Sequence, residues 1–543
     1  QIRSEQRFPD LDIPSRVPRP QISNFQSPFL HDSTFHTMAD SSEKKPLIEK
    51  DAGPKDGNKK GKPKPKPSEF PDYVRESDSI STTGKIVLSS VLVACLAAAF
   101  VLPYHKYRTL MGVGRVLEDV GLDNCQKFEG PAYCEEVHLD KRSGLAFLSC
   151  DPYRPIWNPV LGIENEGLLT SNGEIWVQDL NKKTPPQRIP FSNYNESFHP
   201  LGLTVAPAKS TDKGDSLTLL VVNQPNSEAS TVEIFTYTLS SSILTHLETL
   251  TTPLWTNLDR IAAENLHWGM TPVGGYPIPS FYLTQHHVYP PKDTVMRTAE
   301  DTLFLPIGKV FFYNAIANEA RPTIWRLNNP SGIKADIDFD DGNTLFVTSA
   351  VGGLLERYIS SVLSRTHQFE YKLNPHTGKI DQIYWPGMVV KDTIEWNVVP
   401  QGIDIAYFPA GPTAPLIEAD RVVFATVQAD YFAYKAYARA LETAYKEDPA
   451  DPEARVSVKV PPTVVYRSFQ ERVLPNGEVV TPEMEEDEDF NPKFVMSRFV
   501  IRTLLADAKG KLVRGATGVV VDAERGAVVI VGAYEKGSVV CAL

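Results

Sequence analysis

The chain has 543 residues, of which 42% are hydrophobic and 22% charged, the proportions of an ordinary globular protein. A wholly disordered chain is therefore excluded. The 55 Lys and Arg residues against 67 Asp and Glu residues give a formal net charge of −12. Nucleic-acid binding uses clustered basic side chains that displace counterions from phosphates, so this acidic balance argues against a nucleic-acid partner.

Residues 1–83 form a tail rich in Lys and Pro that lacks hydrophobic periodicity. Such a segment buries too little apolar surface to offset chain entropy, so we expect it to be disordered. Residues 1–37 precede the first methionine, Met38, and we interpret them as an extension of the gene model. The basic, proline-broken tract of residues 59–66 is either a solvated tail or a contact for anionic lipid.

Residues 84–104 are predicted to form a transmembrane helix. The nineteen residues from Ile86 to Tyr104 carry no charge. As a helix they span about 28 Å, close to the ~30 Å hydrocarbon core of a bilayer. A cleavable signal peptide is the alternative, but the segment lies far beyond Met38 and exceeds the usual apolar core of such peptides. We therefore favour an uncleaved anchor, followed by a juxtamembrane stalk over residues 105–119.

Three features indicate how this anchor is oriented. Basic residues before the span modestly outweigh those after it, which favours a cytosolic N-terminus. An even number of cysteines follows the span, which suits an oxidising compartment: Cys125, Cys134, Cys150 and Cys541. Asn195 begins a glycosylation sequon. We expect a single-pass, type II membrane glycoprotein of the secretory pathway whose folded part is lumenal or extracellular.

Residues 120–543 consist mainly of short apolar segments separated by turns. Examples are residues 144–149, 174–177, 217–222, 232–237, 309–313, 344–348, 421–427, 516–521 and 527–531. Such segments, punctuated by Asp-Gly, Asn-Gly and Pro pairs, are typical of β-strands. About 420 residues of this pattern exceed one sandwich and indicate a β-propeller, whose radial closure leaves few exposed strand edges. No repeat period is visible, so spacing alone does not predict the number of blades.

Residues 431–491 interrupt the strand pattern. Residues 431–446 are rich in helix formers with apolar residues three and four apart, which predicts an amphipathic helix. The remainder is Pro-rich and contains the acidic run of residues 483–489, which is either a solvated loop or a calcium or partner site. We interpret the whole segment as an insertion on one face of the domain that could bind a protein partner.

Three groups of residues stand in the order of a known family. They are Asn124-Cys125 with Gly130, Glu135-Glu136 and residues 144–147; residues 219–223 with 230–235; and the C-terminal Val540-Cys541-Ala542-Leu543. Over residues 120–543, apart from the insertion, the chain resembles the serum paraoxonase/arylesterase family. The resemblance implies an all-β, six-bladed β-propeller with two calcium ions in its tunnel. It also implies hydrolysis of lactones, aryl esters and sometimes organophosphates.

The resemblance further implies two structural features. One is membrane association through an uncleaved N-terminal segment. The other is a disulfide between Cys125 and Cys541 that joins the first and last strands. Cys134 and Cys150 have no counterpart in the family, so they either pair with each other or remain buried thiols.

Calcium ligands are implied at four positions of this sequence. These are Glu135, Glu136, Asp259 and Ser331. A hard cation held there would polarise an ester carbonyl and stabilise the developing oxyanion. The chain departs from the family at Arg260, which replaces an aspartate, and at residues 401–402, where Gln-Gly replaces Asp-Asn. Both departures remove negative charge from the expected sites.

The family's proton-transfer residues are also altered. Leu201 occupies the position of the principal histidine, and His199 lies two residues earlier. Gln224 replaces the supporting histidine, and neither leucine nor glutamine can act as a general base. His287 matches a pocket histidine, whereas adjacent residues in an extended segment usually point apart, so His286 need not face the same site. His199 and His287 are therefore the candidate proton acceptors.

These observations lead to hypotheses of different classes. In the first, a membrane-anchored, paraoxonase-like hydrolase cleaves a small ester or lactone with a divergent calcium site. In the second, the propeller has lost catalysis and serves as a lumenal binding or scaffold module. A third possibility is a site remodelled for different chemistry, since one fold hosts many sites. No Gly-x-Ser-x-Gly, His-Glu-x-x-His or Gly-Lys-Ser/Thr motif offers a competing signature.

Overall fold

The computed structural model describes residues 82–543, apart from 183, 208–215, 228, 337–343, 361–367, 374–379, 387, 397, 409–419, 481–483 and 485–494. The predicted disorder of the N-terminal tail and the role of its basic tract fall outside the described residues, as does almost all of the acidic run.

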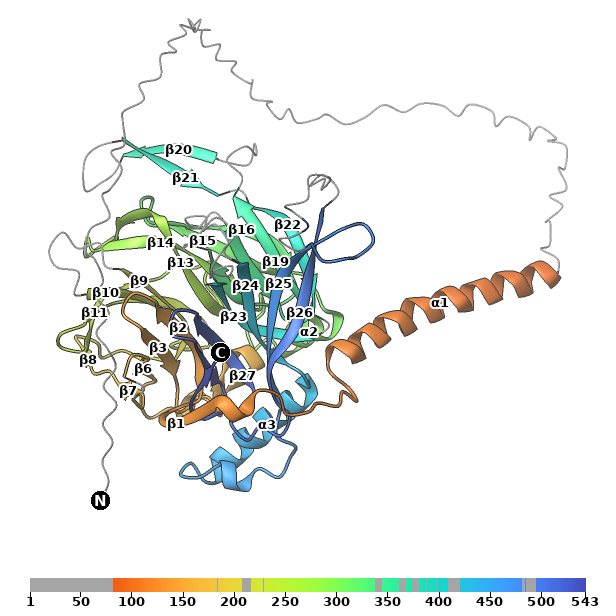
Figure 1. Cartoon of the computed structure of the whole chain (residues 1–543), viewed down its shortest axis with the longest axis horizontal. Helices are drawn as coiled ribbons and strands as arrows, with labels where there is room; N and C mark the ends of the chain where they lie inside the picture. Colours follow the sequence, from red (N-terminus) through yellow and green to blue (C-terminus); the bar gives the residue numbers. More distant parts are fainter. Residues whose placement is uncertain are drawn as a thin grey trace, which may run out of the picture. The chain divides into compact units, whose positions relative to one another are not determined.

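The described part of the chain contains six sheets of four or five strands, and these form a six-bladed β-propeller (Figure 1). The innermost strands of the six sheets contact one another in a closed ring. In chain order the ring is β2, β9, β13, β17, β23 and β27, and β27 contacts β2. The predicted all-β, six-bladed β-propeller is thus confirmed.

Each blade is built outward from its innermost strand. The first three blades are β2 (Cys134–Asp140), β3 (Leu145–Cys150), β6 (Glu174–Asp179) and β7 (Gln187–Arg188); β9 (Pro200–Pro207), β10 (Ser216–Asn223), β11 (Thr231–Thr238), β12 (Ile243–Leu250) and β8 (Phe191–Ser192); and β13 (Leu258–Met270), β14 (Pro277–Gln285), β15 (Gly308–Asn314) and β16 (Glu319–Leu327).

The last three blades follow the same plan. They are β17 (Pro330–Ala335), β18 (Thr344–Ser349), β19 (Leu354–Ser360) and β22 (Met388–Glu395); β23 (Val399–Phe408), β24 (Asp420–Gln428), β25 (Thr463–Val473) and β26 (Met496–Asp507); and β27 (Ala516–Asp522), β28 (Ala527–Gly532), β29 (Lys536–Ala542) and β1 (Cys125–Ala132). Two short hairpins, β4 (Trp157–Asn158) with β5 (Ile163–Glu164) and β20 (Gln368–Leu373) with β21 (Ile380–Trp385), lie outside the blades.

Hydrophobic side chains between neighbouring blades hold the ring together. Leu220 and Ile234 of the second blade, for example, pack with Ile261 and Phe281 of the third. Each side chain of this size contributes about 1.5–3 kcal/mol when it is fully buried. A strand that is covered on both faces has a nearly continuous apolar sequence. β10 is such a strand, because it is buried along almost its entire length.

The sixth blade closes the propeller by pairing the two ends of the domain. The first strand, β1, pairs with the last strand, β29, and Cys125 stands opposite Cys541 and is bonded to it. Figure 1 shows the orange β1 beside the dark blue strands. The predicted disulfide is confirmed. A second disulfide joins Cys134 to Cys150, which are opposite each other on β2 and β3, so these two residues are paired and are not free thiols.

The helix α1 (Thr82–Leu110) contains the predicted helix over residues 84–104 and runs beyond it. Leu110 and Met111 are buried against Ala350, Val351 and Val399 of the propeller. The expected stalk is therefore wrong in part, because its first residues continue the helix and dock on the domain. Among the side chains that are described, which exclude those of residues 95–103 and 106, no helix is long and apolar enough to cross a bilayer.

The helix α3 (Tyr431–Glu447) confirms the helix predicted from residue 431. Asp430 caps its first turn, because the Asp430 carboxylate accepts a hydrogen bond from the Ala433 amide. The extent of the predicted insertion is wrong, however, since residues 463–473 form β25, an integral strand between β24 and β26. The segment that leaves the blade is α3 and the turns after it.

A further helix, α2 (Thr294–Leu303), follows β14.

Candidate functional site

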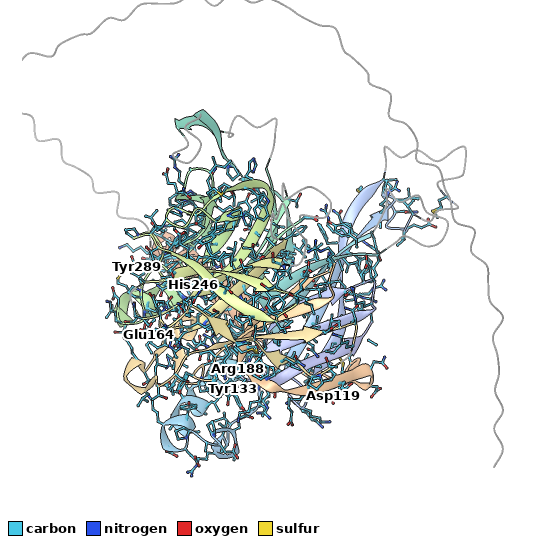
Figure 2. The ribbon with its side chains drawn as sticks, turned by 90° about the vertical axis from the view of Figure 1, so that its left-hand side faces the viewer. Asp119, Tyr133, Glu164, Arg188, His246 and Tyr289 are labelled. Carbon is cyan, nitrogen blue, oxygen red and sulfur yellow. A yellow bond between two sulfur atoms is a disulfide. The ribbon has the colours of Figure 1, made fainter. Side chains whose placement is uncertain are left out.

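One end of the propeller is covered by α3. Tyr434 and Leu441 on this helix pack with Tyr133, which precedes β2. Arg439 Nη2 donates a hydrogen bond to the carbonyl oxygen of Leu161 at 3.2 Å. Figure 2 shows Tyr133 close to the light blue α3. The polar groups described next lie in segments at this end.

His199, at the start of the second blade, is paired with a carboxylate. Its Nδ1 lies 3.0 Å from Asp151 Oδ2, and the side chains are 1% and 0% exposed. Because a carboxylate only accepts hydrogen bonds, Nδ1 carries the proton, and in the neutral ring the lone pair is then on Nε2. The Tyr153 amide holds the other carboxylate oxygen at 2.9 Å. His199 is therefore oriented as a base.

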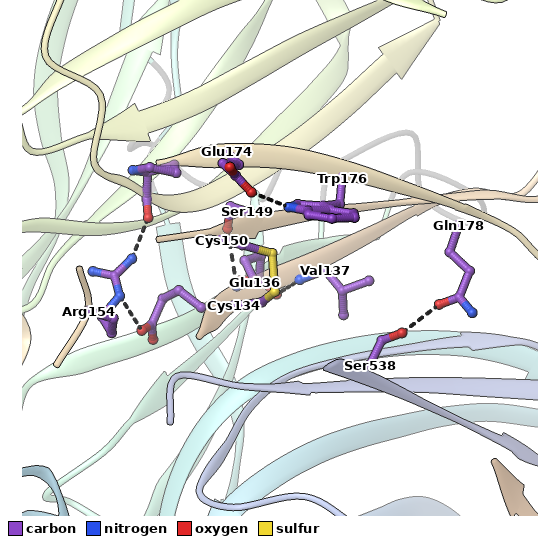
Figure 3. The surroundings of a disulfide bond; sticks show 12 residues. Cys134, Glu136, Val137, Ser149, Cys150, Arg154, Glu174, Trp176, Gln178 and Ser538 are labelled. Atoms are coloured by element: carbon purple, nitrogen blue, oxygen red, sulfur yellow. Dashed lines mark hydrogen bonds and ion pairs between the residues drawn. A yellow bond between two sulfur atoms is a disulfide. The ribbon is translucent and has the colours of Figure 1, made fainter. Parts of the chain in front are cut away.

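Arg154 lies in the same turn as Asp151. Its Nη2 donates to the carbonyl oxygen of Pro200, the residue after His199, at 2.5 Å. Its Nε is 3.8 Å from Glu135 Oε2. Arg154 is fully buried, and its Nε and Nη1 have no hydrogen-bond partner among the described residues. Figure 3 shows this guanidinium near the Cys134–Cys150 disulfide. The turn thus supplies a carboxylate and a cation beside one histidine.

His287 and His286 are buried and form a second cluster with Asp301 of α2, whose side chain is 36% exposed. Asp301 Oδ1 lies 2.7 Å from His287 Nε2, and the two Nδ1 atoms of the histidines lie 2.6 Å apart. The carboxylate places the proton on His287 Nε2, so His287 Nδ1 accepts from His286 and His286 Nε2 keeps its lone pair. Burial lowers the pKa of both rings well below the usual value.

The rule that adjacent residues of an extended segment usually point apart does not hold for His286 and His287, whose rings are in contact. Both residues follow the last residue of β14, Gln285, so the alternation of a strand does not apply to them. Asn329 Nδ2 also lies 2.7 Å from His287 Nε2. Asn329 Oδ1 has no hydrogen-bond partner among the described residues. If the side-chain amide of Asn329 turns by half a rotation, Asn329 Oδ1 becomes a second acceptor for the proton on His287 Nε2. The cluster is a short chain of hydrogen bonds from Asp301 to His286.

The tunnel has a level at which all six innermost strands bulge. Each of these strands carries one residue more than its neighbour in the blade at this level. Such a bulge interrupts the ladder and redirects the residues in it. We call the six equivalent residues the bulge ring; they are Glu136, Gly202, Arg260, Gly332, Gly402 and Gly518. An aliphatic residue follows each of them.

Close packing explains the four glycines of the bulge ring. A Cβ atom at Gly202 would lie 2.6 Å from the Arg260 Cα, and one at Gly402 would lie 2.2 Å from the Thr517 carbonyl oxygen. No side chain fits at these distances. Gly332 meets the Gln401 carbonyl in the same way. This Gly-aliphatic motif recurs through the chain at irregular spacing, so a search for a fixed period misses it.

Arg260 joins the candidate calcium ligands to one another. Its Nη1 donates to Glu136 Oε2 at 2.5 Å and to the Glu135 carbonyl oxygen at 2.7 Å. Its Nη2 donates to Glu135 Oε1 at 2.9 Å and to the Thr517 carbonyl oxygen at 3.2 Å. Asp259 Oδ1 lies 3.5 Å from Nε. We call Glu135, Glu136, Asp259 and Arg260 the arginine cluster.

Burial and charge act in opposite directions in the arginine cluster. Burial raises the pKa of Glu136, although Arg260 counteracts it. Burial also raises the pKa of Asp259 to about 8, and Glu135 and Glu136 add to this shift. For Arg260 burial opposes the charged form, but the surrounding carboxylates raise the pKa above its usual value. The guanidinium is thus permanently charged.

The arginine cluster does not fit a calcium ion as it is arranged. Calcium requires six to eight oxygen ligands directed at one point, and here a guanidinium occupies the space among the carboxylates. Among the described residues, no group of three or more His, Cys, Asp or Glu side chains could hold a metal ion. Ser331 lies beside the bulge ring, but its hydroxyl bonds Thr348 and the Pro400 carbonyl oxygen.

The structure adds three residues that the sequence did not single out. Asp151 and Asp301 are the carboxylate partners of His199 and His287, and Arg154 is a buried cation next to His199. No motif marks them, because 48 residues separate Asp151 from His199 in the chain.

Asn195 is exposed in a loop, as a glycosylation site requires.

Fold and site together define a six-bladed β-propeller with two carboxylate–histidine pairs, both with buried histidines, at one end. Residues 160–361 match the family model described as arylesterase. Serum paraoxonase/arylesterase 2 of Gallus gallus is 29% identical over 235 residues, which are 42% of this chain and 58% of that relative. Serum paraoxonase/arylesterase 1 of Homo sapiens is 31% identical over 166 residues, 29% of this chain and 42% of that relative.

These matches support a divergent relationship of the chain to the serum paraoxonase/arylesterase family. The matched part spans less than two thirds of the length of these relatives. Among solved structures, a luciferin-regenerating enzyme aligns with 77% of this chain and 95% of its own chain, at 8% identity and a TM-score of 0.35. That score is too low to carry an argument.

Proposed function

We propose that the chain is a paraoxonase-like hydrolase of carboxylic esters or lactones in which His199 is the general base. The observation that carries the proposal is the Asp151–His199 pair, which leaves the His199 Nε2 lone pair available in a propeller of this family. Each substrate of this class presents a carbonyl carbon to water, and the reaction needs a base and a stabilised oxyanion.

The site offers a base and a hydrogen-bond donor for such a reaction. His199 Nε2 takes a proton from water while the water oxygen bonds to the carbonyl carbon, and the carbonyl electron pair moves to its oxygen. The Arg154 guanidinium, whose Nη1 makes no hydrogen bond to the described residues, can donate to that oxyanion. On collapse the bond to the leaving alcohol oxygen breaks, and His199 returns the proton to it. Asp151 acts as the positioning residue.

Substrate entry requires movement at the covered end. His199 and Asp151 are almost fully buried, and Tyr434 of α3 packs on Tyr534 within the same end. Burial, followed by the charge of Glu135, raises the pKa of the Tyr534 phenol, so this cover stays neutral. A substrate can therefore reach His199 only when α3 or the adjoining loops move aside.

A hydrolysis assay with a matched histidine variant tests the proposal. We expect the purified full chain to hydrolyse a phenyl ester or a lactone, and His199→Gln to lose about 10²-fold or more of that activity. His246→Gln is the control, because His246 also pairs with a buried carboxylate, Glu233, at 3.1 Å, but lies in an outer strand. Equal activity of His199→Gln and the wild type would contradict the role of His199.

The second candidate function is a catalytically inactive binding or scaffold module. The closed cover over His199 favours it, and the exposed side of α3, which carries Phe432 and Lys435, is the surface for a protein partner. The same assay separates the two functions. Absence of turnover on every ester and lactone, in a chain that melts cooperatively, would favour the module.

We further propose that α1 anchors the chain in a membrane of the secretory pathway with the propeller lumenal or extracellular. The uncharged stretch from Ile86 to Tyr104 and the exposed sequon at Asn195 support this orientation. We expect the full chain to stay in the membrane pellet after alkaline carbonate extraction and to shift in mass after glycosidase treatment. Release into the supernatant would contradict the anchor.

A further inference from the structure

The bulge ring gathers oxygen atoms at the centre of the propeller. Glu135 and Glu136 come from β2, Asp259 from β13 and the Thr517 carbonyl from β27, so three blades contribute. The side chains of Glu135 and Glu136 are 4% and 13% exposed. Buried carboxylates are costly unless a cation neutralises them. This centre therefore requires a positive charge.

Arg260 supplies that charge from within the chain. Four of the six bulge-ring residues are glycines, and the two with side chains, Glu136 and Arg260, are bonded to each other. Arg260 donates four hydrogen bonds from its two terminal nitrogens, to two carboxylates and two main-chain carbonyls. These acceptors are hard oxygen ligands of the kind that bind calcium.

We propose that the Arg260 guanidinium takes the place of a metal ion at the centre of this propeller and makes its fold independent of calcium. A bound ion would have to displace a fully buried side chain and break its ion pairs with Glu135 and Glu136. The guanidinium is covalently part of β13, so no concentration of chelator removes it. It links β13 to β2 and to β27 through direct hydrogen bonds.

Thermal melting of the purified full chain tests this proposal without an activity assay. We expect the melting temperature of the wild type to change by less than about 1 °C between excess calcium and excess EDTA, since a ligand shifts stability only if it binds the folded state. A rise in the wild-type melting temperature with calcium that disappears in Glu135→Gln would overturn the proposal.

Two arginine variants sharpen the test. Arg260→Gln removes the cation and leaves the carboxylates, so we expect a lower melting temperature in EDTA and a recovery of roughly 5 °C or more in calcium. Arg297→Gln is the matched control, because Arg297 is also buried but donates only to carbonyls of Tyr289, Pro159 and Val160.

We expect Arg297→Gln to melt lower with no response to calcium. The proposal would equally be overturned if Arg260→Gln melted like the wild type in EDTA, because the guanidinium would then not hold the centre together. Should Arg260→Gln fail to fold, the comparison of calcium and EDTA on the wild type still decides whether the fold depends on a metal.

Discussion

Replacing Asp151 by asparagine is expected to lower kcat for ester or lactone hydrolysis by about 10²–10⁴-fold, with little change in the melting temperature. The substitution keeps the size of the side chain but gives it an N–H donor. An amide that donates to His199 Nδ1 stabilises the tautomer in which Nε2 carries the proton. Since the present contact is 3.0 Å between Asp151 Oδ2 and Nδ1, the ring itself need not move.

The separate effects on kcat and KM distinguish a positioning role of Asp151 from a purely structural role. A base of the wrong tautomer slows chemistry but binds substrate as before, so kcat should fall while KM stays within about threefold. Asp140→Asn is the control, because Asp140 accepts hydrogen bonds from the Ser143 amide and hydroxyl in a turn between β2 and β3. It should retain wild-type kcat.

A double variant tests whether Asp151 acts through His199. If the two residues work as one unit, Asp151→Asn combined with His199→Gln should be no slower than His199→Gln alone. Full additivity of the two losses, or a wild-type kcat for Asp151→Asn, would contradict the proposed roles. Both outcomes are read from steady-state kinetics on one substrate.

The strand pattern was sufficient to predict a propeller. Short apolar segments such as residues 217–222 became buried strands because each has packing partners on both faces. The Cys125–Cys541 disulfide followed from the family resemblance and is present. The number of blades could not be derived from spacing, because the recurring bulges are separated by segments of very different length, including α3.

The candidate site could be predicted only in part, because its side chains form hydrogen bonds with residues that are distant in the chain. The change from an anion to a cation at Arg260 was visible in the sequence, but its hydrogen bonds to Glu136 and Thr517 depend on how three blades converge. His199 was a candidate base without a known partner, since Asp151 lies in a loop of the preceding blade. A local pattern carries no information about such long-range pairs.

Predictions from the local sequence pattern were less accurate for the loops than for the strands. His286 and His287 were treated as part of an extended segment, and their rings are in contact because the chain turns after Gln285. Residues 463–473 were assigned to an insertion because Pro-rich segments flank them, yet hydrogen bonding to β24 and β26 makes them a blade strand. Tertiary pairing overrode the composition of the surrounding segment.

Glu135→Ala is expected to lower the free energy of unfolding by about 3–5 kcal/mol. Glu135 is the acceptor for Arg260 Nη2 and the nearest carboxylate to Arg154 Nε. Its removal leaves two buried guanidinium groups with less compensation than their desolvation requires. Denaturation by guanidinium chloride measures the loss, and Glu319→Ala is the control, because its pair with Arg321 is at the surface.

The exposed pair of Glu319 and Arg321 should contribute at most about 1 kcal/mol, since water and salt screen it. The decisive comparison is the double variant Glu135→Ala with Arg260→Leu, which removes both members of a buried ion pair. It should be less destabilised than the sum of the single variants, because no unpaired charge of that pair remains buried. Strict additivity, or a loss below about 1 kcal/mol for Glu135→Ala, would mean that the bulge ring is held by its backbone packing and not by the arginine cluster.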